Sequence, residues 1–547
     1  MDNKKQSLKI IFSDALEHYK KRDFKAAEVY CYKILNINPN HFDSLSLLAN
    51  IFAASRNFNK SKEFLEKAIK IEPENTTILN NLGTAYRELG DTEKAMIFYQ
   101  KVLDINSNHT NANYNLGLIF YGLDELKKAK EYLEKTIKIQ PNYAFAHFSL
   151  GNLQKELKEL KQAKESYLKA IELRPSFTSA HNNLGLVYSN IRDPESAIKC
   201  YKKTLEIDPK HAGAHNNLGR LYTEIGELEK AIESHKEAIK LEPQNLLHTY
   251  YLSDLDKEYL NSEVKNKTEE ILNNKETYMT NSVYGNFLLS KYEKNKKNYE
   301  KELNYLIQAH KNYFELKKKK FEIGVRYCFN DVLQISKFAK FKSANKDNKI
   351  KPIYIVGVPR CGSTLIEKII GSGNKSIPMG EEVVGLERFI NTKVLEKKSL
   401  NLGDAGSFAT DLVNIYKDHG LIDEKSNFVF TDKTLNNFFY LGLIKEIFPE
   451  AKVINCQRDP LSSIMSILQN NLTELAWAHH IENIFKYFDC YFQIIDEFKK
   501  KYPGFIYDLN FQDFTNNSEI ESKKLFKYCN LTWDKKCLEF YKRKDIF

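Results

Sequence analysis

The segment from Ile353 to Glu382 reads IYIVGVPRCGSTLIEKIIGSGNKSIPMGEE and joins an apolar strand, a glycine-bounded loop, an apolar helical pattern and two carboxylates. From Gly357 to Thr364 the loop has the outline of a phosphate-binding loop, G-x(4)-G-x-[ST]. Ser363 stands where nucleotide triphosphatases carry a lysine, which argues against ATP or GTP hydrolysis. We therefore predict an anion site on the loop amides and the helix N-terminus, with Arg360 as a side-chain donor. An ordinary strand-to-helix turn is the alternative for the loop alone.

Two further cations follow predicted strands downstream. The apolar runs Phe428–Thr431 and Lys452–Cys456 have strand character, and Lys433 and Arg458 come soon after them. Ligands bind outside the carboxyl ends of the strands in open α/β sheets, and Arg360 also follows a strand. We therefore expect three cations at one edge of a parallel sheet, where they suit a multiply charged ligand. Any one of them, taken alone, is equally explained as neutralising a surface or a helix end.

The chain from Pro352 to its end resembles the sulfotransferase superfamily, and most closely the bacterial tetratricopeptide-repeat sulfotransferases and the protein-tyrosine sulfotransferases. PRCGSTL, from Pro359 to Leu365, is similar to the family loop that holds the 5′-phosphosulfate of 3′-phosphoadenosine 5′-phosphosulfate (PAPS). Arg458-Asp459-Pro460 with Ser466 resembles the element that binds the 3′-phosphate. The resemblance implies an α/β domain with a parallel sheet, and PAPS as co-substrate without a metal. The nucleotide-binding residues that it implies are Arg360, Cys361, Gly362, Ser363, Thr364, Leu365, Arg458 and Ser466.

The same resemblance implies the catalytic residues. DKTLNNFFYLGLI places Lys433 where the family has its catalytic lysine, and Gly380-Glu381-Glu382 matches the G-E-E whose second glutamate is the general base. We expect Glu382 to take the acceptor proton while Arg360 and Lys433 balance charge on the sulfuryl and bridging oxygens. Glu381 is a rival base, and the further candidates are His419, His479 and His480.

Three departures from the family pattern concern the acceptor and the nucleotide. Leu435 replaces a proline, which relaxes the backbone after the lysine. Val384 stands where tyrosine-specific enzymes carry an arginine, so Arg388 is the remaining member of a pair that holds acidic peptides. The chain reaches Phe547 without the serine-rich segment that closes over the nucleotide in the family. We therefore expect this lid segment to be missing.

Prolines recur along the N-terminal half at multiples of 34 residues, which is the period of tetratricopeptide repeats. Glycines that allow two helices to approach closely, and alanines of the second helix, share this register. We predict seven repeats in residues 7–244, stacked as an all-α superhelix. The prolines are Pro39, Pro73, Pro141, Pro175, Pro209 and Pro243, with Ser107 in the vacant position; the glycines are Gly83, Gly117, Gly151, Gly185 and Gly219; the alanines are Ala95, Ala129, Ala163, Ala197 and Ala231.

Asparagines precede the Leu-Gly pair of most repeats, at Asn81, Asn115, Asn183 and Asn217, with Ser149 interrupting the series. Such side chains can pair with both the N–H and the C=O of a peptide backbone. The series resembles the asparagine ladder in the superhelix of O-linked N-acetylglucosamine transferase. We therefore expect a protein or peptide acceptor on the concave face of the repeats. The alternative is that these asparagines satisfy neighbouring backbone groups.

Length and charge fit a two-part protein. The chain has 547 residues and a net charge of +10, which suits anionic ligands without demanding nucleic acid. Residues 245–348 lose the repeat period but keep helical spacing, which indicates helices that cap the repeats and lead to a sulfotransferase domain at 349–547. Lysines 317–320 fit a solvated helix face better than a nucleic-acid or membrane patch. His181 and His215 share one repeat position, which indicates packing rather than metal binding.

The eight cysteines lack metal-binding spacing and indicate a reducing compartment. No apolar run of about twenty residues occurs and the N-terminus lacks a signal-peptide pattern, so we expect a cytoplasmic protein with no membrane partner. Abundant Lys, Asn and Ile point to a bacterial source. Three functions stay open: sulfation of a protein or peptide, above all on tyrosine; sulfation of a glycan or small metabolite; and a catalytically weak repeat scaffold that binds nucleotide or nothing.

Overall fold

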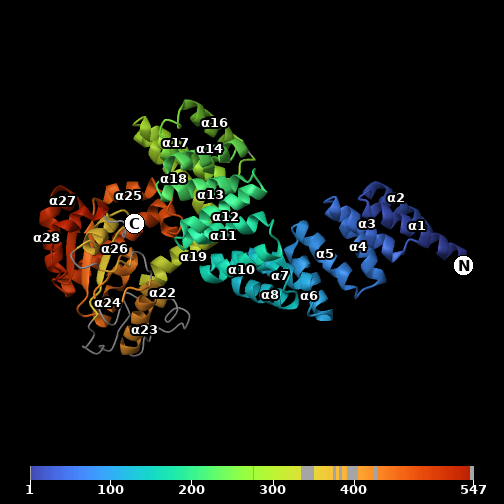
Figure 1. The fold of residues 1–547 in the computed structure, drawn as a ribbon, viewed down its shortest axis with the longest axis horizontal. Helices are drawn as coiled ribbons and strands as arrows, with labels where there is room; N and C mark the ends of the chain where they lie inside the picture. Colours follow the sequence, from blue (N-terminus) through green and yellow to red (C-terminus); the bar gives the residue numbers. More distant parts are fainter. Residues whose placement is uncertain are drawn as a thin grey trace. The chain divides into compact units, whose positions relative to one another are not determined.

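The computed structural model describes residues 2–274, 276–333, 350–373, 377–380, 385–390, 405–422 and 428–542. The chain divides into two compact units, Met1–Pro243 and Gln244–Phe547. The first unit is helical, as the labels between α1 and α14 in Figure 1 show, and the second combines helices with a parallel sheet. The predicted fold class, a helical repeat superhelix followed by an α/β domain, is confirmed.

Helix pairs build the first unit. The turn inside each pair contains a residue with positive φ, and these residues recur with the 34-residue period at Arg22, Arg56, Gly90, Asp124, Lys158, Arg192 and Gly226. The helices are α1 (Asp2–Lys20), α2 (Phe24–Ile37), α3 (Phe42–Ala54), α4 (Phe58–Ile71), α5 (Thr76–Glu88), α6 (Thr92–Ile105), α7 (Thr110–Gly122), α8 (Leu126–Ile139), α9 (Ala144–Glu156), α10 (Leu160–Leu173), α11 (Thr178–Asn190), α12 (Pro194–Ile207), α13 (Ala212–Glu224) and α14 (Leu228–Leu241).

A glycine in the first helix of each of several pairs lies against a large side chain of the second helix. A Cβ built on Gly185 would lie 2.6 Å from the ring of Tyr201, and one on Gly219 would lie 2.6 Å from the ring of His235. Side chains of any size are therefore excluded at these positions unless the helices move apart. The five alanines predicted for the second helices are all fully buried. Close helix packing thus explains why small residues repeat in this register.

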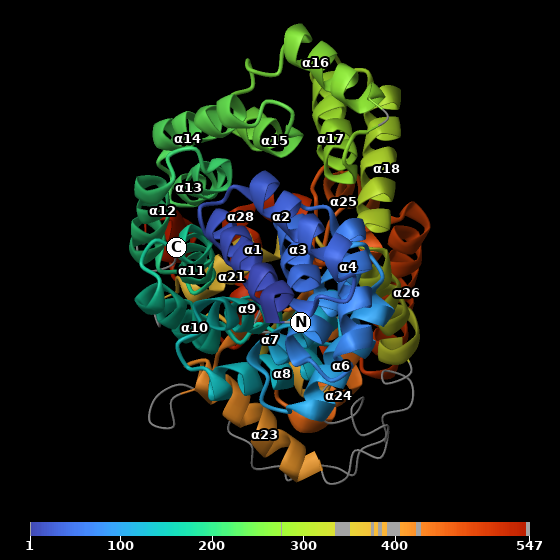
Figure 2. The same cartoon turned by 90° about the vertical axis from the view of Figure 1, so that its right-hand side faces the viewer.

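A group of helices precedes the sheet in the second unit, and all belong to the same compact unit as the sheet. Helices α17 and α18 lie side by side (Figure 2). The elements are α15 (Leu246–Leu255), α16 (Ser262–Asn273), α17 (Met279–Asn295), α18 (Tyr299–Leu316), α19 (Lys318–Arg326) and the π-helical turn η1 (Tyr327–Val332). No described helix of the chain is long and apolar enough to cross a membrane.

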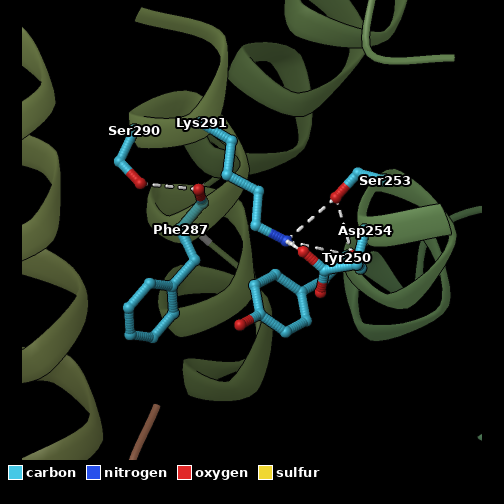
Figure 3. A network of polar contacts seen from close by, with 6 residues as sticks. All are labelled: Tyr250, Ser253, Asp254, Phe287, Ser290 and Lys291. Atoms are coloured by element: carbon cyan, nitrogen blue, oxygen red, sulfur yellow. Dashed lines mark hydrogen bonds and ion pairs between the residues drawn. The ribbon is translucent and has the colours of Figure 1, made fainter. Parts of the chain in front are cut away.

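Lys291 of α17 ties that helix to α15. Its Nζ lies 2.7 Å from Asp254 Oδ1 and 3.1 Å from Ser253 Oγ, and it sits 3.8 Å from the centre of the Tyr250 ring (Figure 3). Burial lowers the pKa of the Lys291 ammonium, whereas Asp254 acts to raise it. A buried cation is tolerated here because an anion, a hydroxyl and an aromatic ring surround it.

The sheet has four parallel strands in the order β2-β1-β3-β4. These are β1 (Ile353–Gly357), β2 (Thr431–Asp432), β3 (Lys452–Gln457) and β4 (Ile506–Asn510). β1 is buried throughout and pairs with β3, with Gly357 opposite Cys456. Parallel pairing places the ends of β1, β2 and β3 at one edge of the sheet.

Two strands differ from the sequence prediction. β2 is a two-residue strand at Thr431–Asp432 rather than Phe428–Thr431, although the carbonyls of Phe428 and Phe430 accept hydrogen bonds from Lys351 and Ile353. β4 was not predicted, because its run is short and its burial does not follow the strict alternation that marks a half-buried strand. The remaining elements are α21 (Ser363–Gly371), α22 (Gly385–Ile390), α23 (Ala405–Asp418), η3 (Leu435–Tyr440), α24 (Leu441–Ile447), α25 (Pro460–Leu468), η4 (Ala476–His479), α26 (Ile481–Lys501), α27 (Phe511–Asn516), α28 (Ser518–Tyr528) and η5 (Lys535–Lys542).

A buried histidine pair joins α18 to η4. His310 Nδ1 lies 2.9 Å from His479 Nδ1, and the Nε2 atoms of the two rings lie 2.8 Å from Leu468 O and 3.1 Å from Leu472 O. Burial lowers the pKa of His310 to about 4, and burial with the neighbouring ring lowers that of His479 to about 3. Two positive charges at this distance and depth cannot both be accommodated.

We expect this pair to make unfolding pH-dependent. The unfolded chain binds protons below the ordinary histidine pKa of 6.5, whereas the folded pair resists protonation until about pH 4, so the free energy of unfolding falls as pH drops through that interval. The effect is about 1.4 kcal/mol per pH unit for each proton involved. His479→Gln should flatten this slope in denaturant titrations, and the exposed neighbour His480→Gln should not. Equal slopes for His479→Gln and the wild type would contradict this expectation.

Candidate active site

The loop between β1 and α21 contains two residues with positive φ. Arg360 has φ 71° and Gly362 has φ 94°. A side chain at Gly362 would also collide with Phe511, because a Cβ there would lie 2.2 Å from the ring. Helix α21 then begins at Ser363, and its N-cap residue Gly362 has no side chain that could cap the first amides. An uncapped helix N-terminus of this kind offers N–H groups and a positive dipole end to an anion.

Hydrogen bonds join the three predicted cations to this loop. Arg458 donates to the carbonyl oxygen of Arg360 over 3.0 Å, and Arg360 Nε donates to Ser466 Oγ over 3.1 Å. Lys433 Nζ donates to Thr364 Oγ1 over 3.2 Å. The structure therefore brings together five residues that the sequence singled out from three separate motifs.

A cavity of about 1030 Å³ lies beside the loop. Arg360, Gly362, Ser363, Thr364 and Arg458 line it on the loop side. Lys433 is buried and does not line the cavity, but its Nζ donates to Thr364, which does. The other walls come from α19 and η1, from η3, and from residues 471–477. The cavity thus extends well beyond the anion loop, with room for an acceptor as well as a nucleotide.

Two residues of the predicted nucleotide loop pack into the protein instead of lining the cavity. Cys361 is fully buried next to Cys456 of β3, and Leu365 packs against the core. The Cys456 thiol donates a hydrogen bond to Cys361, which holds the pKa of Cys361 below its usual value and raises the pKa of Cys456. These two positions can contribute to a ligand only through their backbone.

A buried carboxylate orients the segment that carries Lys433. Asp432 accepts hydrogen bonds from the Tyr416 hydroxyl over 2.7 Å and from the Thr434 amide over 2.9 Å. Tyr416 in turn lies 3.2 Å from the hydroxyl of Tyr354 in β1. Burial raises the pKa of Asp432, and the hydrogen bonds oppose that rise. This network fixes the backbone at the end of β2, from which the lysine extends.

The far side of the cavity carries a polar group that sequence reasoning missed. Glu387 lines it and is hydrogen-bonded by Asn436 and Tyr327. Asn436 Oδ1 accepts from the Tyr487 hydroxyl over 2.7 Å. The one sequence signal was Asn436, which lies in the DKTLNN block. Tyr327 was missed because it belongs to the region interpreted as a linker.

Several residues that the sequence predicts for the site lie outside the part of the chain that the structure describes. Glu381, Glu382 and Val384 lie outside the described residues, and so does the side chain of Arg388, whose backbone belongs to α22. The other candidate bases are described, and none of them lines the cavity. His480 is exposed, and His419 is exposed with its Nδ1 atom 2.7 Å from Ile415 O. His479, the third of these candidate bases, is buried with its ring against His310, so it cannot reach an acceptor.

In the first unit, the asparagines of the predicted ladder contact polar side chains of neighbouring repeats. Asn81 donates to Asn50 over 3.4 Å, Asn183 donates to Asn152 over 2.8 Å, and Asn217 donates to Asn182 over 3.0 Å. Asn115 accepts from Arg87 over 2.9 Å. All four ladder residues are half-buried. The partners are thus side chains rather than the backbone groups that the alternative invoked.

The repeat histidines bind within their own repeats. His181 Nε2 lies 2.9 Å from the carbonyl oxygen of Pro175, and His215 Nε2 lies 3.3 Å from that of Pro209. His147 makes the same contact with Pro141 over 2.9 Å. These contacts pin the start of the first helix of a repeat to the preceding proline turn, which agrees with a packing role.

Comparisons with known proteins support this division of the chain. Residues 352–535 match the model of the sulfotransferase family. Residues 74–142 and 177–243 match a tetratricopeptide-repeat model, and residues 155–191 and 42–75 match two further models of the same repeat. The chain therefore carries tetratricopeptide repeats followed by a domain of the sulfotransferase family.

Relatives and solved structures match further parts of the chain, but none of those named below identifies an acceptor. An uncharacterized protein of Aquifex aeolicus (strain VF5) is 29% identical over 309 residues, which span 50% of this chain and 38% of that protein. The crystal structure of MamA is 28% identical over 30% of this chain and 95% of its own, with a TM-score of 0.29. YrrB is described as a tetratricopeptide-repeat protein with an unusual peptide-binding site. It is 27% identical over 34% of this chain and 96% of its own, with a TM-score of 0.31.

The contact between Arg458 and the loop predicts a nucleotide preference. If Arg458 binds a 3′-phosphate, adenosine 3′,5′-bisphosphate should bind much better than AMP, and Arg458→Ala should erase that difference at a cost of about 1.5–3 kcal/mol. Lys452→Ala is the matched control, because Lys452 begins the same strand at its other end. Calorimetry measures the affinities of the wild type and of the two variants for both nucleotides. Equal affinities of the wild type for the two nucleotides would contradict the assignment.

Proposed function

We propose that this protein transfers a sulfuryl group from PAPS to a hydroxyl group of a protein or peptide, above all a tyrosine hydroxyl, that the repeats help to bind. The observation that carries the proposal is the convergence of Arg360, Lys433 and Arg458 on one uncapped loop, within a domain that matches the sulfotransferase family. Sulfuryl transfer follows from the family, whereas the acceptor is our inference.

The donor set suits the nucleotide. The amides at the start of α21 and the hydroxyls of Ser363 and Thr364 are donors for a 5′-phosphosulfate, and Arg458 with Ser466 is suited to a 3′-phosphate. Ser363 in place of a lysine leaves room for a terminal anion that carries less charge than a triphosphate. PAPS, when bound, supplies an activated sulfuryl group on a phosphate leaving group.

The chain's own residues would then position and stabilise charge. We propose that Lys433, which donates to Thr364 and follows the Asp432 network, would balance charge on the bridging oxygen. Arg360, whose Nε donates to Ser466, would neutralise the sulfuryl oxygens. Glu382 is our proposal for the group that takes the proton of the acceptor hydroxyl, on the strength of the G-E-E match. As in phosphoryl transfer, most of the catalysis would come from positioning and electrostatics.

The repeats support a protein or peptide acceptor. Tetratricopeptide repeats generally bind extended peptides or proteins on a concave surface. The four half-buried asparagines of the first unit retain hydrogen-bonding capacity beyond their single side-chain contacts, because each amide has two donor hydrogens and two acceptor lone pairs. A glycan or small metabolite is the second candidate acceptor, and it is favoured by Val384, which removes one of the arginines that hold acidic peptides.

The base assignment predicts a large kinetic effect. Glu382→Gln keeps the side-chain shape but removes its basicity, so turnover should fall by about 10²–10⁴ while nucleotide affinity stays nearly unchanged. Glu381→Gln, the matched control, should have a smaller effect. Initial rates with labelled PAPS give the comparison. An inactive Glu381→Gln beside an active Glu382→Gln would move the base by one residue, and two fully active variants would refute the glutamate mechanism.

If the repeats bind the acceptor, changes on their surface should reduce sulfuryl transfer to protein acceptors alone. Replacing Asn81, Asn115, Asn183 and Asn217 by alanine should weaken transfer to a protein acceptor but leave PAPS affinity intact. Helical content should also persist, since these residues are not part of the apolar stacking between repeats. The control replaces Asn40, Asn59, Asn108 and Asn142, which are exposed elsewhere in the repeat region. Unchanged protein labelling by the first variant would favour the small-acceptor alternative.

A further inference from the structure

The charges on the cavity wall are separated. Among the described residues that line it, the cations are Arg360 in the loop between β1 and α21, and Arg458, which donates a hydrogen bond to that loop from the end of β3. The acids are Glu387 in α22 and Glu474 in the segment before η4. A nucleotide bound at the loop would occupy both cations. The rest of the described wall then presents neutral and acidic groups to the acceptor.

Glu387 is held in place by hydrogen bonds from two other elements. Asn436 and Tyr327 hydrogen-bond to it from η3 and η1, and both are fixed in turn, since Asn436 accepts from Tyr487 and Tyr327 bonds to Tyr440. Burial raises the pKa of Glu387 and the two hydrogen bonds oppose that rise. No cation contributes to its electrostatic surroundings among the described residues. A mostly buried carboxyl group that has hydrogen bonds, but no cation among its described neighbours, is stabilised in its charged form most effectively by a cation from the ligand.

The neighbouring wall suits a ring that carries such a cation. Tyr327, Phe439, Tyr440 and Trp477 line the cavity around Glu387 and Asn436. Trp477 is fixed by stacking on Tyr487 with the ring centres 3.7 Å apart. Aromatic walls of this kind bind a ligand ring by area and bind a positive nitrogen through their faces. The close contact of Gly324 with Ala476, where a Cβ would lie 2.8 Å away, brings α19 against this wall.

We propose that Glu387 determines acceptor specificity by binding a positively charged nitrogen next to the hydroxyl that is sulfated, so that the acceptor is a phenol with a basic neighbour. The inference rests on the proposed function and refines its acceptor. This preference for a cation is the reverse of that of the enzymes that hold acidic peptides with a pair of arginines. In this chain Val384 stands at the position of one of those two arginines. The positive nitrogen comes either from a basic residue beside a tyrosine or from a small aromatic amine.

Three phenols of similar size test the proposal by binding alone. Tyramine is cationic, para-ethylphenol is neutral and para-hydroxyphenylpropionate is anionic. Calorimetry with the full chain, both free and saturated with adenosine 3′,5′-bisphosphate, should show tyramine binding about tenfold or more tightly than either of the others. Glu387→Gln should reduce tyramine to the level of ethylphenol and leave ethylphenol unchanged. Glu482→Gln, an exposed acid in the first turn of α26, is the control.

The outcomes separate this inference from the proposed function. Equal binding of the three phenols, preference for the anion, absence of phenol binding, or an unchanged order in Glu387→Gln would each overturn it. Because the order is measured with and without nucleotide, the role of Glu387 is tested independently of nucleotide binding. Failure of the bisphosphate to bind would count against the proposed function instead. Two tyrosine peptides, one flanked by lysine and one by glutamate, then identify the source of the positive nitrogen. If the acceptor is a peptide, the lysine-flanked peptide should bind more tightly; if it is a small amine, both peptides should bind weakly.

Discussion

The hydrogen bond from Arg458 to the main-chain carbonyl of Arg360 is the contact on which the rest of the site depends. A left-handed backbone conformation costs about 1–2 kcal/mol for a residue other than glycine, and Arg360 adopts one. Arg458 stabilises that conformation from the end of β3, and Ser466 fixes the side chain of Arg360 from α25. The turn puts Gly362, which has no capping side chain, before α21, so the strain at Arg360 lies in the loop where we predict that an anion binds.

A second constraint comes from the helices before the sheet. They share one compact unit with it, and His310 on α18 packs against His479 while Gly324 on α19 contacts Ala476. These contacts place Tyr327 in the cavity wall, where it hydrogen-bonds to Glu387. The helical region is therefore part of the site and not only a connection to it. Acceptor selection would depend on residues that lie far from the sulfotransferase motifs in the sequence.

Much of this arrangement is predictable from sequence, and the remainder has a physical reason for being missed. The repeats follow from a period, and the convergence of Arg360, Lys433 and Arg458 follows from the rule that parallel strands end at one edge. The His310 and His479 pair joins residues 169 positions apart, which no local pattern encodes. Glu387 has no motif of its own, and its importance comes from burial and from partners on other elements. Likewise, Cys361 matches the nucleotide loop in sequence, yet its side chain packs beside Cys456.

The most direct test of the proposed chemistry is transfer of heavy-sulfur label from PAPS by the full chain to a cell lysate, followed by mass spectrometry of both peptides and glycans. Lys433→Ala supplies the blank, because Lys433 is held at the loop by Thr364. We predict label on tyrosine residues of proteins, present with the wild-type chain and lost with Lys433→Ala. Label confined to glycans or small metabolites would contradict the protein acceptor, and no label at all beside intact binding of adenosine 3′,5′-bisphosphate would contradict sulfuryl transfer itself.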